Sequence, residues 1–301
     1  MTNMTPDLII ETSQLHKSFK DKPALRGLDL RVPAGSIFGF LGRNGAGKTT
    51  TIKTLMGLLR PDSGTASVFG IPIADVDRAA EVRRRIGFVT EDKELYPYMT
   101  VEQIIRFTRP FFPKWRIDLE QRYLEMFELP PRQKIPSLSK GMRSKLMLLL
   151  AISRGADLLI LDEPTDGLDP AAVEDVLREL VAIAASSETT MFFSSHQLTE
   201  VDRIADHIGI IDHGKMIVTG SLDDMKAHYQ RLHIVFADSV QPPTHWPEGV
   251  ESVRHEGRVI SILASHNVDA IAAEAQSIPG ATVERFPVTL KEIFLEHVRS
   301  N

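Results

Sequence analysis

The stretch GRNGAGKT, residues 42–49, matches the pattern G-x-x-x-x-G-K-[ST] in full. It lies between an apolar run typical of a buried strand, SIFGFLG (36–42), and a run typical of a helix, KTTTIKTLMGLL (48–59). The glycines let the backbone curl so that successive N–H groups point inward, and the dipole of the following helix adds positive potential. The sequence therefore predicts a phosphate-binding loop, and the alternative is a glycine-rich turn that binds nothing.

The loop also predicts which of its residues hold a nucleotide. Lys48 is expected to reach the β- and γ-phosphates, Thr49 to ligate Mg²⁺ through its hydroxyl, and Thr50 to hold the α-phosphate. The other residues predicted to line the nucleotide do so through the backbone: Gly42, Asn44, Gly45, Ala46 and Gly47.

Strand-like and helix-like runs alternate outward from this loop. DLLILDEP (157–164) and TTMFFSSH (189–196) read as buried strands, and helical patterns follow at 171–185 and 197–204. This alternation predicts an α/β fold with a mostly parallel sheet covered on both faces. A helix-rich texture at about 95–152 predicts a helical subdomain within a first domain of residues 1–225. A small α+β domain is predicted over 226–301.

An acidic pair ends the strand predicted in DLLILDEP. Asp162 is placed to hold Mg²⁺, and Glu163 is placed to orient and deprotonate a water that attacks the γ-phosphate. His196 follows the strand MFFSS and is a candidate hydrogen-bond donor to the same phosphate. The alternatives are a helix cap or surface charge for the acids and a strand-end histidine without a special role.

Composition excludes several other classes of protein. The chain has 301 residues, of which 43% are hydrophobic and 25% charged, and its net charge of −5 predicts no general polyanion-binding surface. It contains no cysteine, which excludes disulfides and thiolate metal sites. The N-terminus lacks the pattern of a signal peptide, and the longest apolar stretch, Leu146–Ile152, is too short to span a bilayer. We therefore expect a soluble chain.

Five motifs in order resemble the ATP-binding subunit of an ABC transporter: GRNGAGKTT, GFVTED, LSKGM, LLILDEPTDGLDP and SSH. The resemblance covers residues 7 to about 225. It implies a P-loop NTPase cassette with a mostly parallel core sheet, an antiparallel β subdomain and a helical subdomain, followed by the small α+β domain. It also implies an ATPase that uses ATP and Mg²⁺ and couples hydrolysis to transport.

The resemblance assigns further residues to the nucleotide. Ser139 and the amide of Gly141 are implied to contact the γ-phosphate held by another subunit, while Ser139 is also expected to cap the helix that follows it. Asp169 is implied to link the two sites across a dimer. Phe19 occupies the place of an aromatic that stacks on adenine, with a buried core phenylalanine as the alternative.

Two positions depart from the usual family pattern. Glu91 stands where glutamine is usual, so we expect a Mg²⁺ ligand and catalytic residue that cannot donate a hydrogen bond as an amide can. LSKGM replaces the common LSGGQ, which is expected to bring the Lys140 cation near the opposing phosphates.

The resemblance also implies partners. These are an integral membrane permease subunit and a second ATP-binding subunit, in a homodimer or a heterodimer on the cytoplasmic face of the cell membrane. No nucleic acid is expected. Aromatics in YPYMTVEQ and RPFFPKWR are candidates for docking the permease or for an ordinary subdomain core. We expect an exporter of the drug or multi-substrate type; import, a soluble ABC-type ATPase acting on ribosomes or DNA, and a subunit that binds ATP without turnover are the alternatives. The role of the C-terminal domain stays open.

Overall fold

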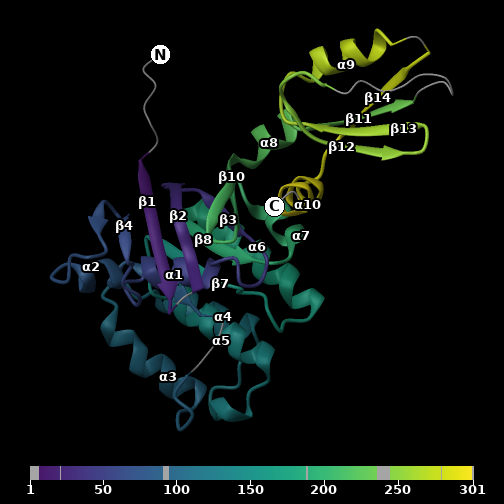
Figure 1. The fold of residues 1–301 in the computed structure, drawn as a ribbon. Coiled ribbons are helices and arrows are strands. Elements are labelled where there is room, and N and C mark those ends of the chain that lie inside the picture. Colours follow the sequence, from purple (N-terminus) through teal and green to yellow (C-terminus); the bar gives the residue numbers. More distant parts are fainter. Residues whose placement is uncertain are drawn as a thin grey trace. The chain divides into compact units, whose positions relative to one another are not determined.

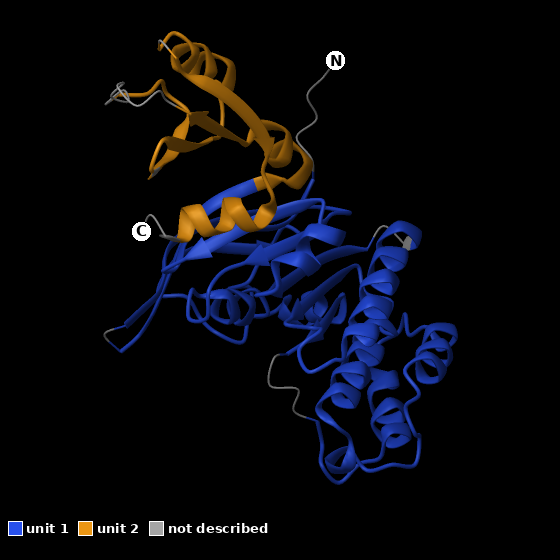
Figure 2. Cartoon of the chain, turned by 90° about the vertical axis from the view of Figure 1, so that its right-hand side faces the viewer, with its two compact units in different colours: residues 1–219 blue, residues 220–301 orange. Residues whose placement is uncertain are grey.

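The computed structural model describes residues 7–20, 22–90, 95–187, 189–235, 245–278 and 280–299. The chain forms two compact units, residues 1–219 and 220–301, coloured separately in Figure 2. The boundary predicted at residue 225 falls inside helix α8 (Leu222–His228), which belongs to the second unit.

A six-stranded sheet forms the centre of the first unit, with the order β10-β9-β3-β8-β7-β6. Its strands are β3 (Ile37–Leu41), β6 (Ile86–Val89), β7 (Leu158–Asp162), β8 (Thr190–Ser195), β9 (His207–Asp212) and β10 (Lys215–Ser221). Strand β3 pairs in parallel with β8 and β9, and β7 pairs in parallel with β6 and β8. Every residue of β3, β7 and β8 is buried, as expected for a parallel sheet covered on both faces.

A second, antiparallel sheet has the order β2-β1-β4-β5. Its strands are β1 (Leu8–Phe19), β2 (Lys22–Pro33), β4 (Ser63–Val68) and β5 (Ile71–Pro72). One hydrophobic core joins it to the central sheet and to helix α1 (Lys48–Leu55), through side chains such as Leu28, Phe40 and Ile52. This core fixes the helix that follows the glycine-rich loop.

Helices cover both faces of the central sheet. Phe38 and Phe40 of β3 point into the core that contains α1, whereas a Cβ at Gly39 would meet Val201 of α7 (Leu198–Ile204), so α7 lies on the other face. The first unit also contains α2 (Ala79–Arg84) and α6 (Pro170–Ser187), and α6 contacts α7. Helix α1 is shorter than predicted, since Gly57 adopts a positive φ of 67° and the chain turns there.

The regular secondary-structure elements between residues 95 and 152 are all helices (Figure 1). It contains α3 (Val101–Thr108), η1 (Arg109–Phe111), α4 (Ile117–Met126), η2 (Ile135–Ser137) and α5 (Lys140–Ile152). Thr100 and Gln103 form a capping box at the start of α3, which satisfies two backbone N–H groups. Helix α5 packs against β6, so the helical region is joined to the edge of the central sheet.

The second unit contains an antiparallel sheet with the order β12-β13-β11-β14. Its elements after α8 are β11 (Gln230–Val235), β12 (Val250–Glu256), β13 (Val259–Ala264), α9 (Val268–Gln276), β14 (Thr282–Pro287) and α10 (Leu290–Arg299). Leu232, Ile262 and Ile271 form its core. The predicted fold class is therefore confirmed. Within the described residues, no helix has both the length and the apolar character that crossing a membrane requires.

Candidate functional site

The predicted phosphate loop, the acidic pair and His196 meet at the carboxyl ends of the parallel strands of the central sheet. Leu41, at the end of β3, pairs with Ser195, and Asp162, at the end of β7, pairs with Ser194 of β8. The three strands therefore end at the same level, and their following loops lie side by side. In open parallel sheets, ligands bind outside the carboxyl ends of strands.

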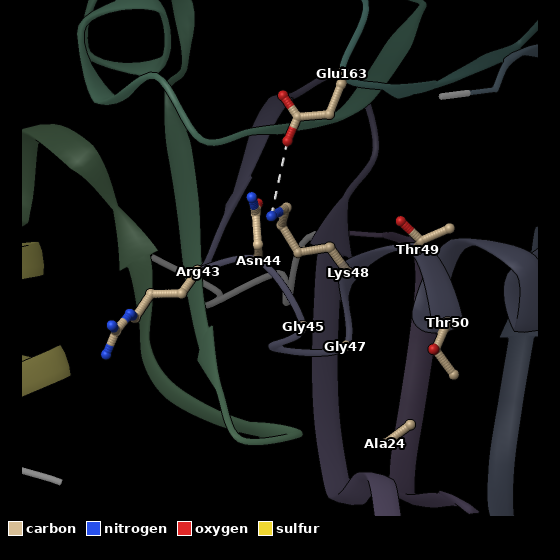
Figure 3. Close-up of a pocket in the computed structure, with 9 residues that line it drawn as sticks. All are labelled: Ala24, Arg43, Asn44, Gly45, Gly47, Lys48, Thr49, Thr50 and Glu163. Carbon is tan, nitrogen blue, oxygen red and sulfur yellow. Dashed lines mark ion pairs between the residues drawn. The ribbon is translucent and has the colours of Figure 1, made fainter. Parts of the chain in front are cut away.

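A cavity of about 330 Å³ opens at this edge (Figure 3). Seven residues predicted for the site line it: Asn44, Gly45, Gly47, Lys48, Thr49, Thr50 and Glu163. Ala24 and Arg43 line it as well. Predicted residues Gly42, Ala46, Asp162 and His196 lie at the same strand ends without lining the cavity.

Backbone conformation explains the glycines of the loop. Gly45 and Gly47 have φ values of 81° and 116°, a region that residues with a Cβ disfavour. A Cβ at Gly47 would lie 2.8 Å from the carbonyl oxygen of Ala24, whereas one at Gly45 would meet nothing within 4 Å. Gly42 is required for packing, because its Cβ would lie 2.5 Å from the carbonyl oxygen of Ile211.

Lys48 points its ammonium group into the centre of the site. The residue is only 7% exposed. Its Nζ donates to the carbonyl oxygen of Gly42 at 2.8 Å and lies 3.7 Å from Oε1 of Glu163 (Figure 3). A buried cation at the N-terminus of a helix attracts phosphate oxygens.

Glu163 is held from several directions. Its φ is +50°, unusual for a residue with a side chain, and its N–H donates to the carbonyl oxygen and the hydroxyl of Ser194 at 3.3 and 3.2 Å. Its Oε2 lies 2.8 Å from Nδ1 of His196. Because an ionised carboxylate only accepts hydrogen bonds, Nδ1 is the donor in this contact. The Ser194 hydroxyl also donates to Oδ1 of Asp162 at 2.5 Å.

The oxygen atoms present fit the ligand preference of Mg²⁺. Thr49 offers a hydroxyl and Asp162 a carboxylate, both hard donors. Across the described part of the chain, no cluster of three or more acidic or histidine side chains is arranged to hold a metal by itself. This donor set suits an ion that takes its remaining ligands from phosphates and water. Glu91, the third predicted ligand, lies outside the described residues.

Ser139, Gly141 and Asp169 lie away from this cavity. Ser139 caps α5, since its Oγ accepts from the N–H of Met142 at 3.1 Å, and it remains exposed. Gly141 packs against the backbone of Gly167, where a Cβ would lie 2.9 Å from the carbonyl oxygen. Asp169 accepts from the N–H of Ala172, and this hydrogen bond keeps the pKa of Asp169 below its usual value.

The contacts of Lys140 and the exposure of Phe19 could not be predicted from the sequence. Nζ of Lys140 forms an ion pair with Asp166 of its own chain at 2.8 Å. Phe19 is 50% exposed, so the alternative of a buried core phenylalanine is wrong. Nζ of Lys17 lies 5.9 Å from the centre of its ring.

Comparison with known proteins decides the family. The pattern of the family described as ABC transporter matches residues 25–166. The daunorubicin resistance ATP-binding protein DrrA3 of Streptomyces coeruleorubidus is 33% identical over 97% of this chain and 95% of its own length. The chain belongs to the ATP-binding subunits of ABC transporters. It is an ABC transporter ATPase.

Other relatives agree with this assignment. The daunorubicin/doxorubicin resistance ATP-binding protein DrrA of Streptomyces peucetius is 39% identical, over 75% of this chain and 69% of its own. The bacitracin transport ATP-binding protein BcrA of Bacillus licheniformis is 36% identical, over 72% and 71%. A solved ATP-binding subunit of an ABC transporter has 29% identity and a TM-score of 0.66, covering 73% of this chain and 92% of its own. A dimeric cassette bound to ADP and Pi, at 21% identity with a TM-score of 0.65 over 71% and 98%, shares the fold.

Three residues of the cassette site were not predicted. Ser194 joins Asp162 to the backbone of Glu163, and only its place in a strand-end SSH sequence distinguishes it. Ala24 and Arg43 line the cavity, but neither residue type carries a chemical signal in the sequence. Ala24 enters the site because β2 passes Gly47 closely.

The two loop glycines generate a prediction about stability without nucleotide. Gly45→Ala should lower the free energy of unfolding by about 1 kcal/mol, since it places a Cβ at positive φ in open space. Gly47→Ala should lower it by about 3 kcal/mol, because steric overlap with the Ala24 carbonyl adds to the strain. Urea denaturation of both variants measures the difference. Equal losses would contradict the assigned overlap.

Proposed function

We propose that this subunit powers export across a membrane by hydrolysing ATP in two sites formed between two cassette subunits. A single observation carries the proposal: the residues predicted to contact ATP lie in two separate places on the same chain. The cavity holds the phosphate loop and Glu163, whereas Ser139, Gly141 and Asp169 lie elsewhere on the same chain, with Ser139 and Asp169 exposed. A second subunit can supply these groups to the phosphates.

Within one site, different residues bind the phosphates, the adenine and the metal ion of Mg²⁺-ATP. Lys48, the loop amides and the N-terminus of α1 hold the β- and γ-phosphates, and Thr50 holds the α-phosphate. The half-exposed ring of Phe19 provides the face on which adenine stacks. Thr49 and Asp162 would hold Mg²⁺, with Glu91 as a third ligand, and the ion would supply positive charge beside the transferred phosphoryl group.

Glu163 and His196 carry the hydrolysis. Glu163 orients a water and accepts its proton, and His196, held by Glu163 through Nδ1, contacts the γ-phosphate. In the structure, Lys48 interacts with Glu163, so a γ-phosphate competes with this carboxylate for the same ammonium group. Binding of ATP therefore rearranges the contacts of the base.

ATP joins the two subunits because each γ-phosphate receives groups from both. Ser139, the Gly141 amide and the N-terminus of α5 contact the phosphate held by the partner, and Asp169 links the two sites. Moving a clamp from mostly open to mostly closed requires about 5.5 kcal/mol of differential affinity. Two sites then supply about 3 kcal/mol each, which a few charge-assisted hydrogen bonds can provide.

A surface in the helical region supports docking of a permease subunit. A groove of about 540 Å³ is lined mainly by apolar residues, including Phe88, Tyr96 and Phe107. We call it the aromatic groove, together with the neighbouring Tyr98 and Phe111. Tyr96, Tyr98, Phe107 and Phe111 are exposed and contact one another ring to ring. Exposed aromatic side chains gathered at a groove are typical of interaction sites rather than of a subdomain core.

Export is favoured by the relatives. Their names describe daunorubicin resistance, bacitracin transport and, for an ATP-binding protein of Burkholderia lata at 37% identity, Nod factor export. We place the subunit on the cytoplasmic face of the membrane, where ATP is available, as a homodimer or a heterodimer.

The role of the base is tested by Glu163→Gln. This variant should bind ATP normally, hydrolyse it at least about 100-fold more slowly and accumulate as a closed dimer, because an amide cannot accept the proton. Turnover assays and light scattering with ATP measure both effects. Glu102→Gln, on the exposed surface of α3, is the matched control. Normal turnover by Glu163→Gln would contradict the assignment.

Shared sites are tested by mixing two inactive variants. Lys48→Ala lacks a phosphate ligand in its own site, and Ser139→Ala lacks the group given to its partner. Half of a randomly mixed population is hybrid, and each hybrid has one complete site, so ATPase activity should return to about a quarter of wild type. Either variant alone should stay inactive. A mixture that also stays inactive would exclude sites shared between two copies of this chain.

Docking is tested by combining Tyr96→Ala with Phe107→Ala. The isolated subunit should keep its ATPase activity within about twofold, while the fraction that sediments with membranes of its own organism should fall at least about tenfold, because hot-spot aromatics dominate such interfaces. Val76→Ala removes another exposed apolar side chain outside the groove and should bind normally. Unchanged sedimentation of the double variant would refute this docking surface.

A further inference from the structure

We propose that Glu200 is a positioning residue for ATP hydrolysis, which holds the segments carrying Glu163 and His196 at a fixed separation. The inference rests on the proposed role of Glu163 as the base. Glu200 lies in the first turn of α7 and touches neither the cavity nor the phosphate loop.

One carboxylate oxygen of Glu200 receives two hydroxyl groups from different segments. Oε2 accepts from Oγ1 of Thr165 at 2.8 Å and from Oγ of Ser195 at 3.1 Å. Glu200 is 4% exposed, Thr165 is 2% exposed and Ser195 is 0% exposed, so water does not compete for these hydrogen bonds. The three side chains form a dry junction.

The junction lies directly behind the reactive side chains. Thr165 follows Glu163 by two residues, and Ser195 immediately precedes His196. Glu163 and His196 themselves meet at 2.8 Å, on the cavity side. The Glu200 oxygen therefore closes a ring of contacts that joins both segments through the reactive pair and through the hydroxyls, in addition to the hydrogen bonds from the Glu163 N–H to Ser194.

A buried carboxyl group is an unfavourable choice at this junction if its only role is to fill space. Burial raises the pKa of Glu200, the hydrogen bonds from the hydroxyls of Thr165 and Ser195 oppose the rise, and the nearby charge of Glu163 adds to it. Oε1 is buried and has no hydrogen-bond partner among the described residues. An apolar side chain of similar volume would avoid the unpaired Oε1, but it would leave the buried hydroxyl of Thr165 without its acceptor. A carboxyl group here is explained by the two hydroxyls that it holds.

Precise placement matters at this point because Glu163 is strained. Its positive φ of 50° persists only where surrounding contacts fix the backbone. Loss of the junction frees the segment after Glu163 to relax, and displacement of a catalytic group by about 1 Å reduces a rate by about 100-fold. Nucleotide affinity depends on the phosphate loop and should change little.

Glu200→Ala and Glu200→Gln test the proposal. Glu200→Ala should lower kcat for ATP hydrolysis at least about tenfold while KM for ATP stays within about twofold. Glu200→Gln keeps an acceptor oxygen for both hydroxyls and should retain kcat within about threefold of wild type. Wild-type kcat for Glu200→Ala, or equal loss in both variants, would overturn the proposal. A fall in Tm with normal kcat of the folded protein would overturn it too, since that is the signature of packing alone.

A double-variant comparison shows whether Glu200 acts through Thr165. Thr165→Val removes the donor and keeps the shape of the side chain, so it should lower kcat by itself. Combined with Glu200→Ala, it should add no further loss, because both changes remove the same link. Fully additive losses would contradict the link. Glu174→Ala is the matched control: Glu174 joins α6 to Arg203 of α7 at 2.5 Å on the surface, and its removal should leave kcat unchanged.

Glu163→Gln distinguishes this proposal from the function on which it rests. If Glu163→Gln turns over ATP normally, the assignment of the base fails, whatever Glu200 does. If Glu163→Gln is inactive while Glu200→Ala has wild-type kcat, only the positioning role of Glu200 fails.

Discussion

Backbone pairing aligns Leu41 of β3 with Ser195 of β8, and Ser194 of β8 with Asp162 of β7. The phosphate loop, the acidic pair and His196 follow these strands directly, so the register brings together groups that are far apart in the sequence. A slip of one residue turns every side chain of a strand to the opposite face of the sheet. Because all residues of β3, β7 and β8 are buried, such a slip would force side chains of the wrong size and polarity into closely packed positions. Packing of the core thus determines the geometry of the site.

Three carboxyl groups near the carboxyl ends of these strands, those of Asp162, Glu163 and Glu200, have different partners, and these partners suit the different roles that we propose for them. Asp162 receives the hydroxyl of Ser194, Glu163 lies between Lys48 and His196, and Glu200 receives two hydroxyls. Glu163 interacts with two groups that an incoming phosphate would also attract. In the proposed site its surroundings would therefore change when ATP binds, whereas the hydrogen bonds of Glu200 to Thr165 and Ser195 lie behind the reactive pair.

The local parts of the fold and site could be predicted from the sequence, because their signals are contiguous. Strand, glycine loop and helix follow one another from 36 to 59, and Ser139 caps α5 through the N–H of Met142 only three residues away. Long-range contacts could not be predicted. The ion pair of Lys140 with Asp166 depends on the packing of α5 against the loop after β7, so the sequence alone does not reveal it. Exposure of Phe19 and of the groove aromatics likewise depends on tertiary packing.

The first turns of α5 are fixed to the loop that follows Glu163 by three kinds of contact. Lys140 pairs with Asp166, the Ser144 hydroxyl donates to the Asp166 carbonyl at 3.0 Å, and Gly141 leaves no space for a Cβ beside Gly167. The exposed ion pair is weak in isolation, but steric contact and the part-buried hydrogen bond restrict the same two segments. Ser139, which we assign to the partner's ATP, is therefore positioned by the segment that carries the proposed base of its own chain. If the two sites are shared as we propose, movement of the loop after Glu163 in one subunit would move the group that closes the other site, so the two sites would not change independently.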